Sequence, residues 1–323
     1  MRVLFKTGSL VIEAPGEWDL EKVGTRNVEG YVAAFEEHGF DYELLDPAEL
    51  TRRWPQFRLE GSERVIFQKD SGLVDARKAN PVHITLARAR GATVLEETPV
   101  RAIRLSGESV EVVTDGRTYL TSRVVVASDA WTTEVLGKAG TRIPLTVTQE
   151  QVTYYATPNL RQFSPERFPV VMWHGADNFY GFPVYGEVAT KLGQHMGGHE
   201  VTAKTRTFEP DPGRLERYRG FLGRHIPGFL GPEIYTKTCL YTIPPDQNFI
   251  MDTLPEHPPG LGRYRGGPRL QVRRPYWPHP LGAGPERGVP LPYRGVPTGS
   301  AGDVRCRLRA NLTRVRRRRQ WTT

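Results

Sequence analysis

The stretch Thr236-Lys-Thr-Cys-Leu-Tyr-Thr-Ile-Pro-Pro-Asp-Gln-Asn-Phe-Ile-Met-Asp252 is the most informative part of this chain. It places one cysteine, Cys239, two residues before Tyr241 and thirteen before Asp252. The β-branched and aromatic residues on both sides of its Pro-Pro-Asp segment predict two strands joined by a turn. A lone thiol in such a setting is often an inert buried cysteine, and that interpretation stays open at this point.

A series of strands is expected to lead into this stretch, because the residues alternate as those of a half-buried sheet do. The expected strands begin at Gln151-Val-Thr-Tyr-Tyr and continue through Val170–Trp173, Phe179–Pro183, Ala189–Leu192 and Thr238–Tyr241. Two motifs fall on them, Tyr180-Gly-Phe-Pro183 and Lys191-Leu-Gly-Gln-His195. Successive strand side chains point to opposite faces, so Lys191 and His195 are expected on the same face.

The first half of the chain mixes helices and strands. Asp46 and Pro47 have the residue types of an N-cap and a first helical position. A helix followed by a glycine and a strand predicts a βαβ fragment. The expected elements are helices over Val28–His38, from Asp46 onward and over Arg77–Arg90, a strand over Thr93–Glu96, and a largely buried strand over Tyr119–Val126.

Together these motifs resemble the monomeric sarcosine oxidase and N-methyl-amino-acid oxidase family of flavoproteins, within the D-amino-acid-oxidase-like superfamily. The resemblance covers roughly residues 3–258. In that family the matching cysteine bonds covalently to the flavin of FAD, and the tyrosine after it faces the substrate. The resemblance therefore implies that Cys239 binds the cofactor and that Tyr241 contacts the substrate.

The resemblance also implies a catalytic set. Lys191 would lie over the flavin edge, where a fixed cation stabilises the anion that develops on O2. His195 could bond a carboxylate or favour the unprotonated substrate amine, and Tyr180 would line the pocket beside Tyr241. A solvated lysine, a structural histidine and ordinary core tyrosines are the alternative interpretations.

Further cofactor contacts are implied at Val100, Ala130 and Trp131. Backbone groups at Val100 would meet the adenine side of FAD, although a plain edge residue is the alternative there. Ala127-Ser-Asp-Ala-Trp131 stands where family members usually have Gly-Ala-Trp. Asp129 thus occupies the glycine position, and a carboxylate beside a pyrophosphate would be repulsive.

Both ends of the chain depart from the family pattern. The chain starts at a strand that members reach only after a dinucleotide-binding unit with Gly-x-Gly-x-x-Gly, and no such motif follows an expected strand here. From Pro259 onward there are 15 Arg, no Lys and two acidic residues, a net charge of +13. Gly and Pro supply 19 of these last 65 residues, which predicts a disordered tail.

A shifted reading frame explains this tail. The codons CCA CGG CTT CAA GTT CGC can encode Pro268–Arg273. Preceded by GG, the same bases encode Gly-His-Gly-Phe-Lys-Phe-Ala, the lysine-bearing signature that the family carries near this point. In the family that lysine helps to bind the substrate carboxylate. Alternatively, the clustered arginines could bind nucleic acid.

Composition excludes several classes of protein. The sequence contains no run of 18 apolar residues, so no membrane span is predicted. The apolar stretch at the N-terminus is too short for a signal peptide. Only two cysteines occur, which fits a reducing cytoplasm. No Cys/His spacing indicates a metal site.

The resulting prediction is an α/β (α+β) protein: an incomplete FAD-binding Rossmann-like domain interleaved with a mixed β-sheet substrate domain. The expected boundaries are 1–60 and 141–258 for the substrate domain, 61–140 for the FAD-binding fragment and 259–323 for the disordered tail. We expect a monomeric, cytoplasmic oxidase of sarcosine or another N-methyl amino acid, using FAD and O2, without a metal, and impaired in this form. A catalytically inactive fragment and a basic-tail nucleic-acid binder are the alternatives.

Overall fold

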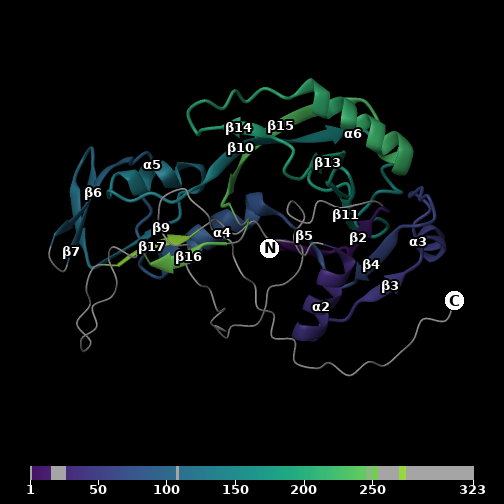
Figure 1. The fold of residues 1–323 in the computed structure, drawn as a ribbon, viewed down its shortest axis with the longest axis horizontal. Coiled ribbons are helices and arrows are strands. Elements are labelled where there is room, and N and C mark those ends of the chain that lie inside the picture. The colour runs from purple at the N-terminus through teal and green to yellow at the C-terminus, as the bar shows by residue number, and fades with distance from the viewer. Residues whose placement is uncertain are drawn as a thin grey trace, which may run out of the picture. The chain divides into compact units, whose positions relative to one another are not determined.

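A nine-stranded sheet carries the core in this computed structural model, which describes residues 2–15, 27–106, 109–245, 247, 249–253 and 269–273. Its strands run in the order β14-β10-β13-β12-β11-β2-β4-β3, and β15 pairs with the other edge of β10 (Figure 1). The bounds are β2 Ser9–Glu13, β3 Glu43–Leu45, β4 Arg64–Gln68, β10 Thr146–Tyr155, β11 Val170–His174, β12 Phe179–Phe182, β13 Thr190–Gln194, β14 His199–Val201 and β15 Glu233–Ile243.

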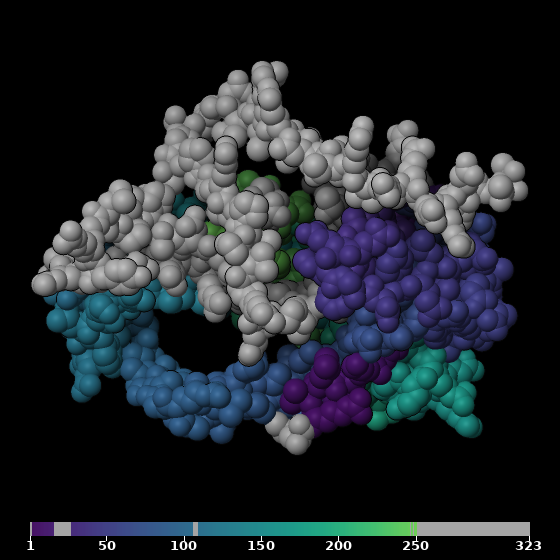
Figure 2. Space-filling view, turned by 90° about the horizontal axis from the view of Figure 1, so that it is seen from below, coloured from purple at the N-terminus to yellow at the C-terminus, as the bar shows by residue number. Residues whose placement is uncertain are grey.

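Three smaller sheets accompany the large one among the described residues. β1 pairs with β5, β6 with β7 and β7 with β8, while β17 pairs with both β16 and β9. Figure 2 shows the purple N-terminal residues next to the blue residues around α4, as the β1–β5 pairing requires. The bounds are β1 Leu4–Lys6, β5 Gly72–Val74, β6 Val100–Ser106, β7 Ser109–Thr114, β8 Thr118–Thr121, β9 Arg123–Val126, β16 Met251–Thr253 and β17 Arg269–Arg273.

Four of the described α-helices begin at a residue whose side chain caps the first turn. The Asp46 carboxylate accepts the backbone N–H of Glu49 at 2.7 Å, and Pro47 occupies the first turn, as predicted. Asp211 caps α6 in the same way. The bounds are α2 Val28–His38, α3 Pro47–Arg53, α4 Ala76–Ala89, η1 Asp129–Trp131, α5 Thr132–Gly137, α6 Pro212–His225 and η2 Pro227–Phe229. No helix in the described part of the chain has the length and apolar run that a membrane crossing needs.

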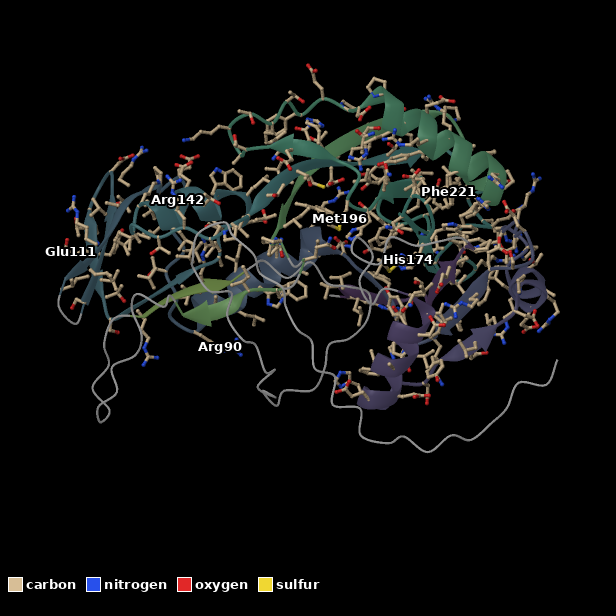
Figure 3. The ribbon with its side chains drawn as sticks, in the orientation of Figure 1. Arg90, Glu111, Arg142, His174, Met196 and Phe221 are labelled. Atoms are coloured by element: carbon tan, nitrogen blue, oxygen red, sulfur yellow. The ribbon has the colours of Figure 1, made fainter. Side chains whose placement is uncertain are left out.

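Aromatic side chains between the sheet and α6 form the main core. Phe221 of α6, labelled in Figure 3, stacks on Phe179 of β12 with ring centroids 4.1 Å apart. Phe229 meets Phe163 edge to face at 5.2 Å. Tyr218 and Leu222 of α6 are fully buried in the same cluster. Helix α6 thus covers one face of the sheet, and the opposite face of β10, β12, β13 and β15 carries the candidate site.

Three sequence predictions are wrong in the structure. Thr93–Glu96 is not a strand, because no described strand pairs with it and Leu95 is half exposed. The expected single strand over Tyr119–Val126 is two strands, β8 and β9, with Leu120 and Val125 exposed.

The third concerns the tail, which was expected to lack secondary structure. Arg269–Arg273 forms β17, which pairs with β9 in parallel and with β16 in antiparallel. Its sequence alternates apolar and polar residues, the pattern of a strand. The remaining part of the predicted tail lies outside the described residues.

Candidate active site

The strand register places the predicted catalytic residues on one face of the large sheet. Tyr180 of β12 lies opposite Gly193 of β13, and Lys191 of β13 lies opposite Tyr154 of β10. Residues directly opposite each other in a sheet share a face. Gly193 is required here, because a Cβ atom would lie 2.5 Å from the Tyr180 hydroxyl oxygen. The glycine therefore lets the tyrosine side chain lie across β13.

Strand β15 extends the same face beyond β10. Cys239 lies opposite Glu150, and Tyr241 lies opposite Thr148. We call this surface the cysteine face. Its members are Thr148, Glu150, Tyr154, Tyr180, Phe182, Lys191, Cys239 and Tyr241. The structure thus brings four of the predicted site residues together from the consecutive strands β12 and β13 and from β15, which lies much later in the sequence.

Lys191 sits among aromatic rings. Its Nζ atom lies 4.2 Å from the Phe182 ring centroid and 5.8 Å from that of Tyr154. Such contacts stabilise a cation by the ring quadrupole. Burial nevertheless lowers the Lys191 pKa to about 8, and the positive charges of Arg77 and Lys237 add to the effect. Lys191 therefore changes charge close to physiological pH.

The thiol and the phenols of the cysteine face keep their protons. Burial, followed by the charge of Glu150, raises the pKa of Cys239 to about 11. Burial also raises the pKa of Tyr180 and of Tyr241, whose side chains are hydrogen-bonded to each other. This face therefore presents the Lys191 ammonium group and the Glu150 carboxylate beside hydroxyl groups and a thiol.

His195 lies just beyond the end of β13. Its backbone N–H donates to the carbonyl of Asn178 at 2.7 Å, and its ring centroid lies 5.6 Å from that of Tyr241. His195 forms a turn with Met196, labelled in Figure 3, whose φ is +59°. The predicted placement of His195 near the other candidate residues is thus observed, but on a turn instead of a strand.

The predicted cofactor contacts outside β15 lie on two other elements, η1 and β6. Ala130 is buried and Trp131 is exposed in η1, which packs against β15. Val100 starts β6, in a separate three-stranded sheet, and its carbonyl accepts the Lys138 ammonium at 2.5 Å. Asp129 has φ +46°, the left-handed conformation that favours glycine. The backbone therefore has a glycine-like conformation where the sequence comparison expected a glycine.

Sequence reasoning missed several members of the cysteine face. Phe182 stands two residues after Tyr180, so the alternation of strand side chains could have identified it. Glu150 and Tyr154 carry no such signal, because their positions opposite Cys239 and Lys191 follow from strand register alone.

Comparison with known proteins identifies the family. Residues 4–266 match the family described as FAD dependent oxidoreductase. This chain belongs to that family. A relative named monomeric sarcosine oxidase, from Bacillus sp. strain B-0618, is 30% identical over 259 residues, 79% of this chain and 65% of its own length. N-methyl-L-tryptophan oxidase from Yersinia pestis strain Pestoides F is 28% identical, covering 78% of this chain and 67% of the relative.

Two solved structures share the fold of this chain. The open form of NikD, described as an unusual amino acid oxidase essential for nikkomycin biosynthesis, superposes with a TM-score of 0.66 at 25% identity, covering 86% of this chain and 70% of NikD. L-proline dehydrogenase from P. horikoshii shares the fold, with a TM-score of 0.62 at 19% identity over 84% of this chain and 67% of the dehydrogenase. The chain spans 65% and 64% of the lengths of two monomeric sarcosine oxidases that it matches.

The residues of this FAD dependent oxidoreductase fit the flavin ring end of the cofactor. The cysteine face combines a half-buried thiol, an ammonium group, the half-buried phenol of Tyr180 and the buried phenol of Tyr241, a donor set suited to a planar, electron-accepting ring. The phosphate end is less well matched. No Gly-x-Gly-x-x-Gly segment follows a strand in the described residues, and Asp129 adds a carboxylate near the backbone that would approach FAD.

The conformation of Asp129 gives a stability test. The free energy of unfolding of Asp129→Gly should exceed that of Asp129→Ala by about 1 kcal/mol, because alanine keeps the Cβ atom that the left-handed conformation disfavours. Urea unfolding followed by circular dichroism measures the difference. A more stable alanine variant would show that the left-handed conformation does not govern this position.

Proposed function

We propose that this protein is an FAD-dependent oxidase of secondary amines, with sarcosine or another N-methyl amino acid as substrate. The reaction would convert the substrate, O2 and water into the demethylated amine, formaldehyde and hydrogen peroxide. The cysteine face carries the proposal, because it gathers Cys239, Lys191, Tyr180 and Tyr241 on adjoining strands. The names of the curated relatives support the substrate class.

FAD supplies the hydride acceptor when it is bound, and the side chains of this chain supply attachment, orientation and charge. Cys239 would hold the flavin through its sulfur. Lys191 would place its ammonium group where negative charge develops on oxygen, the step at which a fixed cation contributes most. The neutral phenols of Tyr180 and Tyr241 would donate hydrogen bonds to the substrate.

His195 completes the proposed set at the edge of the cysteine face. Its ring lies close to Tyr241, where a neutral imidazole could accept the proton of a substrate amine. Ala130 and Trp131 would contact the cofactor from η1, which packs against β15, and Val100 would do so from β6. We further propose a monomer with a small amine and O2 as its partners, as the word monomeric in the names of two relatives suggests.

A peroxide assay tests the proposal directly. The full chain is incubated with FAD, freed of excess cofactor and supplied with sarcosine or N-methyl-L-tryptophan, with glycine as the control. Peroxide and formaldehyde should form in equal amounts with at least one N-methyl amino acid and not with glycine. A folded chain that yields neither product with any N-methyl amino acid would instead be the inactive fragment.

A further inference from the structure

Strand β10 changes partner in the middle of one edge. β14 pairs with residues 147–149 and β13 with residues 152–155, so the ladder on this edge is interrupted at residues 150–151. Helix α6 fills the interruption with a guanidinium group. Arg214 donates from Nη1 to the carbonyl of Gln149 at 3.3 Å and from Nη2 to that of Gln194 at 3.2 Å. Arg214 thus donates hydrogen bonds to one backbone carbonyl of β10 and one of β13 at the interruption.

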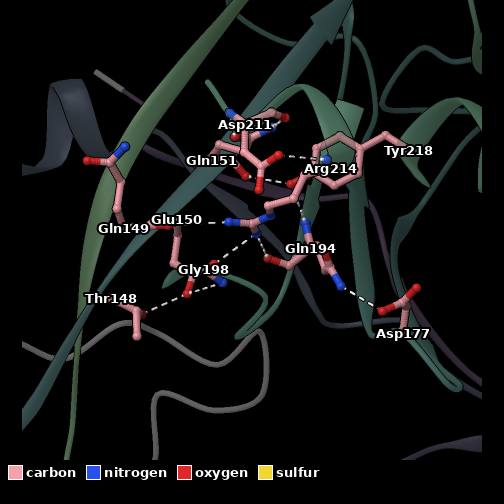
Figure 4. Close-up of polar contacts among 10 residues, drawn as sticks. All are labelled: Thr148, Gln149, Glu150, Gln151, Asp177, Gln194, Gly198, Asp211, Arg214 and Tyr218. Carbon is pink, nitrogen blue, oxygen red and sulfur yellow. Dashed lines mark hydrogen bonds and ion pairs between the residues drawn. The ribbon is translucent and has the colours of Figure 1, made fainter. Parts of the chain in front are cut away.

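The same guanidinium forms a fully buried ion pair with Glu150 (Figure 4). Arg214 Nη2 lies 2.8 Å from Glu150 Oε2, and the side chains are 1% and 0% exposed. The other carboxylate oxygen, Oε1, accepts the Thr148 hydroxyl at 2.8 Å and the Gly198 backbone N–H at 3.1 Å. Removing one member of such a pair leaves an uncompensated buried charge, so the two residues act as a unit.

Glu150 also connects this pair to the proposed site. It lies opposite Cys239 in the β10–β15 register, so their Cβ atoms are about 4.5–5.5 Å apart. Gly198 lies two residues after the His195–Met196 turn, and a Cβ atom on Gly198 would lie 2.7 Å from Glu150 Oε1. One carboxylate therefore sits beside the thiol and holds the turn that carries the histidine.

We propose that the Glu150–Arg214 pair is a positioning device of this site, which sets the charge beside the Cys239 thiol and fixes the turn that bears His195. The proposal deepens the proposed function, on which the roles of Cys239 and His195 rest. The pair itself need not touch substrate or cofactor. Its effect on the thiol can be measured in the chain without FAD.

Several groups face Cys239 from the surrounding elements. They are Glu150 on β10, Arg214 on α6, Arg206, Lys191 on β13, and the phenols of Tyr180 and Tyr241. Glu150 is the anion among them, and its charge opposes formation of a thiolate. Without it, the thiol would face three cations, and the thiolate would form at lower pH.

The test is the pH dependence of Cys239 alkylation by iodoacetamide in the full chain, in a Cys306→Ser background. The thiolate is the reacting species, so Glu150→Gln should lower the midpoint of the alkylation pH profile by about one pH unit or more. At pH values below the midpoint, alkylation should be about tenfold faster than in the wild type. Glu216→Gln is the matched control, because this carboxylate lies on α6 with its side chain 79% exposed. It should leave the profile unchanged.

Near-UV circular dichroism must accompany each variant, since unfolding would also expose the thiol. If Glu150→Gln does not fold, the neutral double variant Glu150→Gln/Arg214→Met replaces it and should shift the midpoint in the same direction by a smaller amount. An unchanged midpoint in whichever variant is folded overturns the proposal. The assay contains no amine substrate, so a failed oxidase assay leaves its result intact.

Discussion

Replacing Cys239 with alanine should abolish any acid-stable yellow colour of protein that has incorporated FAD, if the proposed attachment through this thiol is correct. A thioether between sulfur and flavin survives acid precipitation, whereas a cofactor held only by non-covalent contacts is released when the chain unfolds. The effect is all or none, because the cysteine face contains one thiol. The visible absorbance of the washed, redissolved precipitate measures it, with the supernatant as the complementary sample.

Cys306→Ser is the matched control for this experiment. Cys306 is the other cysteine of the sequence and lies outside the described residues. The control variant should keep the wild-type colour in the precipitate. Equal colour in precipitates of the Cys239→Ala variant and the wild type would show that the flavin is not attached through Cys239, and the assignment of β15 as the attachment strand would then be wrong.

Features that depend on neighbouring residues could be predicted from the sequence. Helix α2 covers the predicted residues Val28–His38, and Asp46 and Pro47 begin α3 as expected. Caps and first-turn residues act over three or four positions, so their signal is local. The two short motifs on β12 and β13 also gave the location of Tyr180 and Lys191, because a strand repeats every two residues.

Features that depend on distant partners could not be predicted. Thr93–Glu96 has the composition of a strand, but a strand exists only where another chain segment accepts its hydrogen bonds, and none does so in the described structure. In the same way, Arg214 reads in sequence as an ordinary charged helix residue. Its burial follows from the change of partner along β10, which no local pattern records.

The strand observed within the tail, β17, shows the converse case. Arg269–Arg273 was grouped with its Pro-, Gly- and Arg-rich surroundings, and the average composition of that segment predicts disorder. Five alternating residues are nevertheless enough for a strand when two other strands, β9 and β16, pair with them. Composition over a long window therefore concealed a local pattern.

Replacing Lys191 with methionine should slow oxygen consumption by the FAD-loaded enzyme by roughly 10²–10³-fold, the usual cost of removing one fixed group that stabilises a developing anion. Reduction of the enzyme by amine substrate without oxygen should change by less than about threefold, because no comparable anion forms in that half of the reaction. Methionine keeps the length and apolar contacts of the lysine beside Phe182 and Tyr154. Stopped-flow absorbance separates the two half-reactions.

The pH profile supplies the control for charge. Burial lowers the Lys191 pKa to about 8, so the wild-type oxygen reaction should fall as pH rises through that value and the ammonium loses its proton. Unfolding does not explain such a fall, since a lysine that binds its proton less tightly in the folded chain makes folding more favourable between about pH 8 and its ordinary value. Lys191→Arg keeps its charge and should lose the decline. Equal slowing of both half-reactions by Lys191→Met, or the same decline in Lys191→Arg, would show that Lys191 does not act through its charge on oxygen.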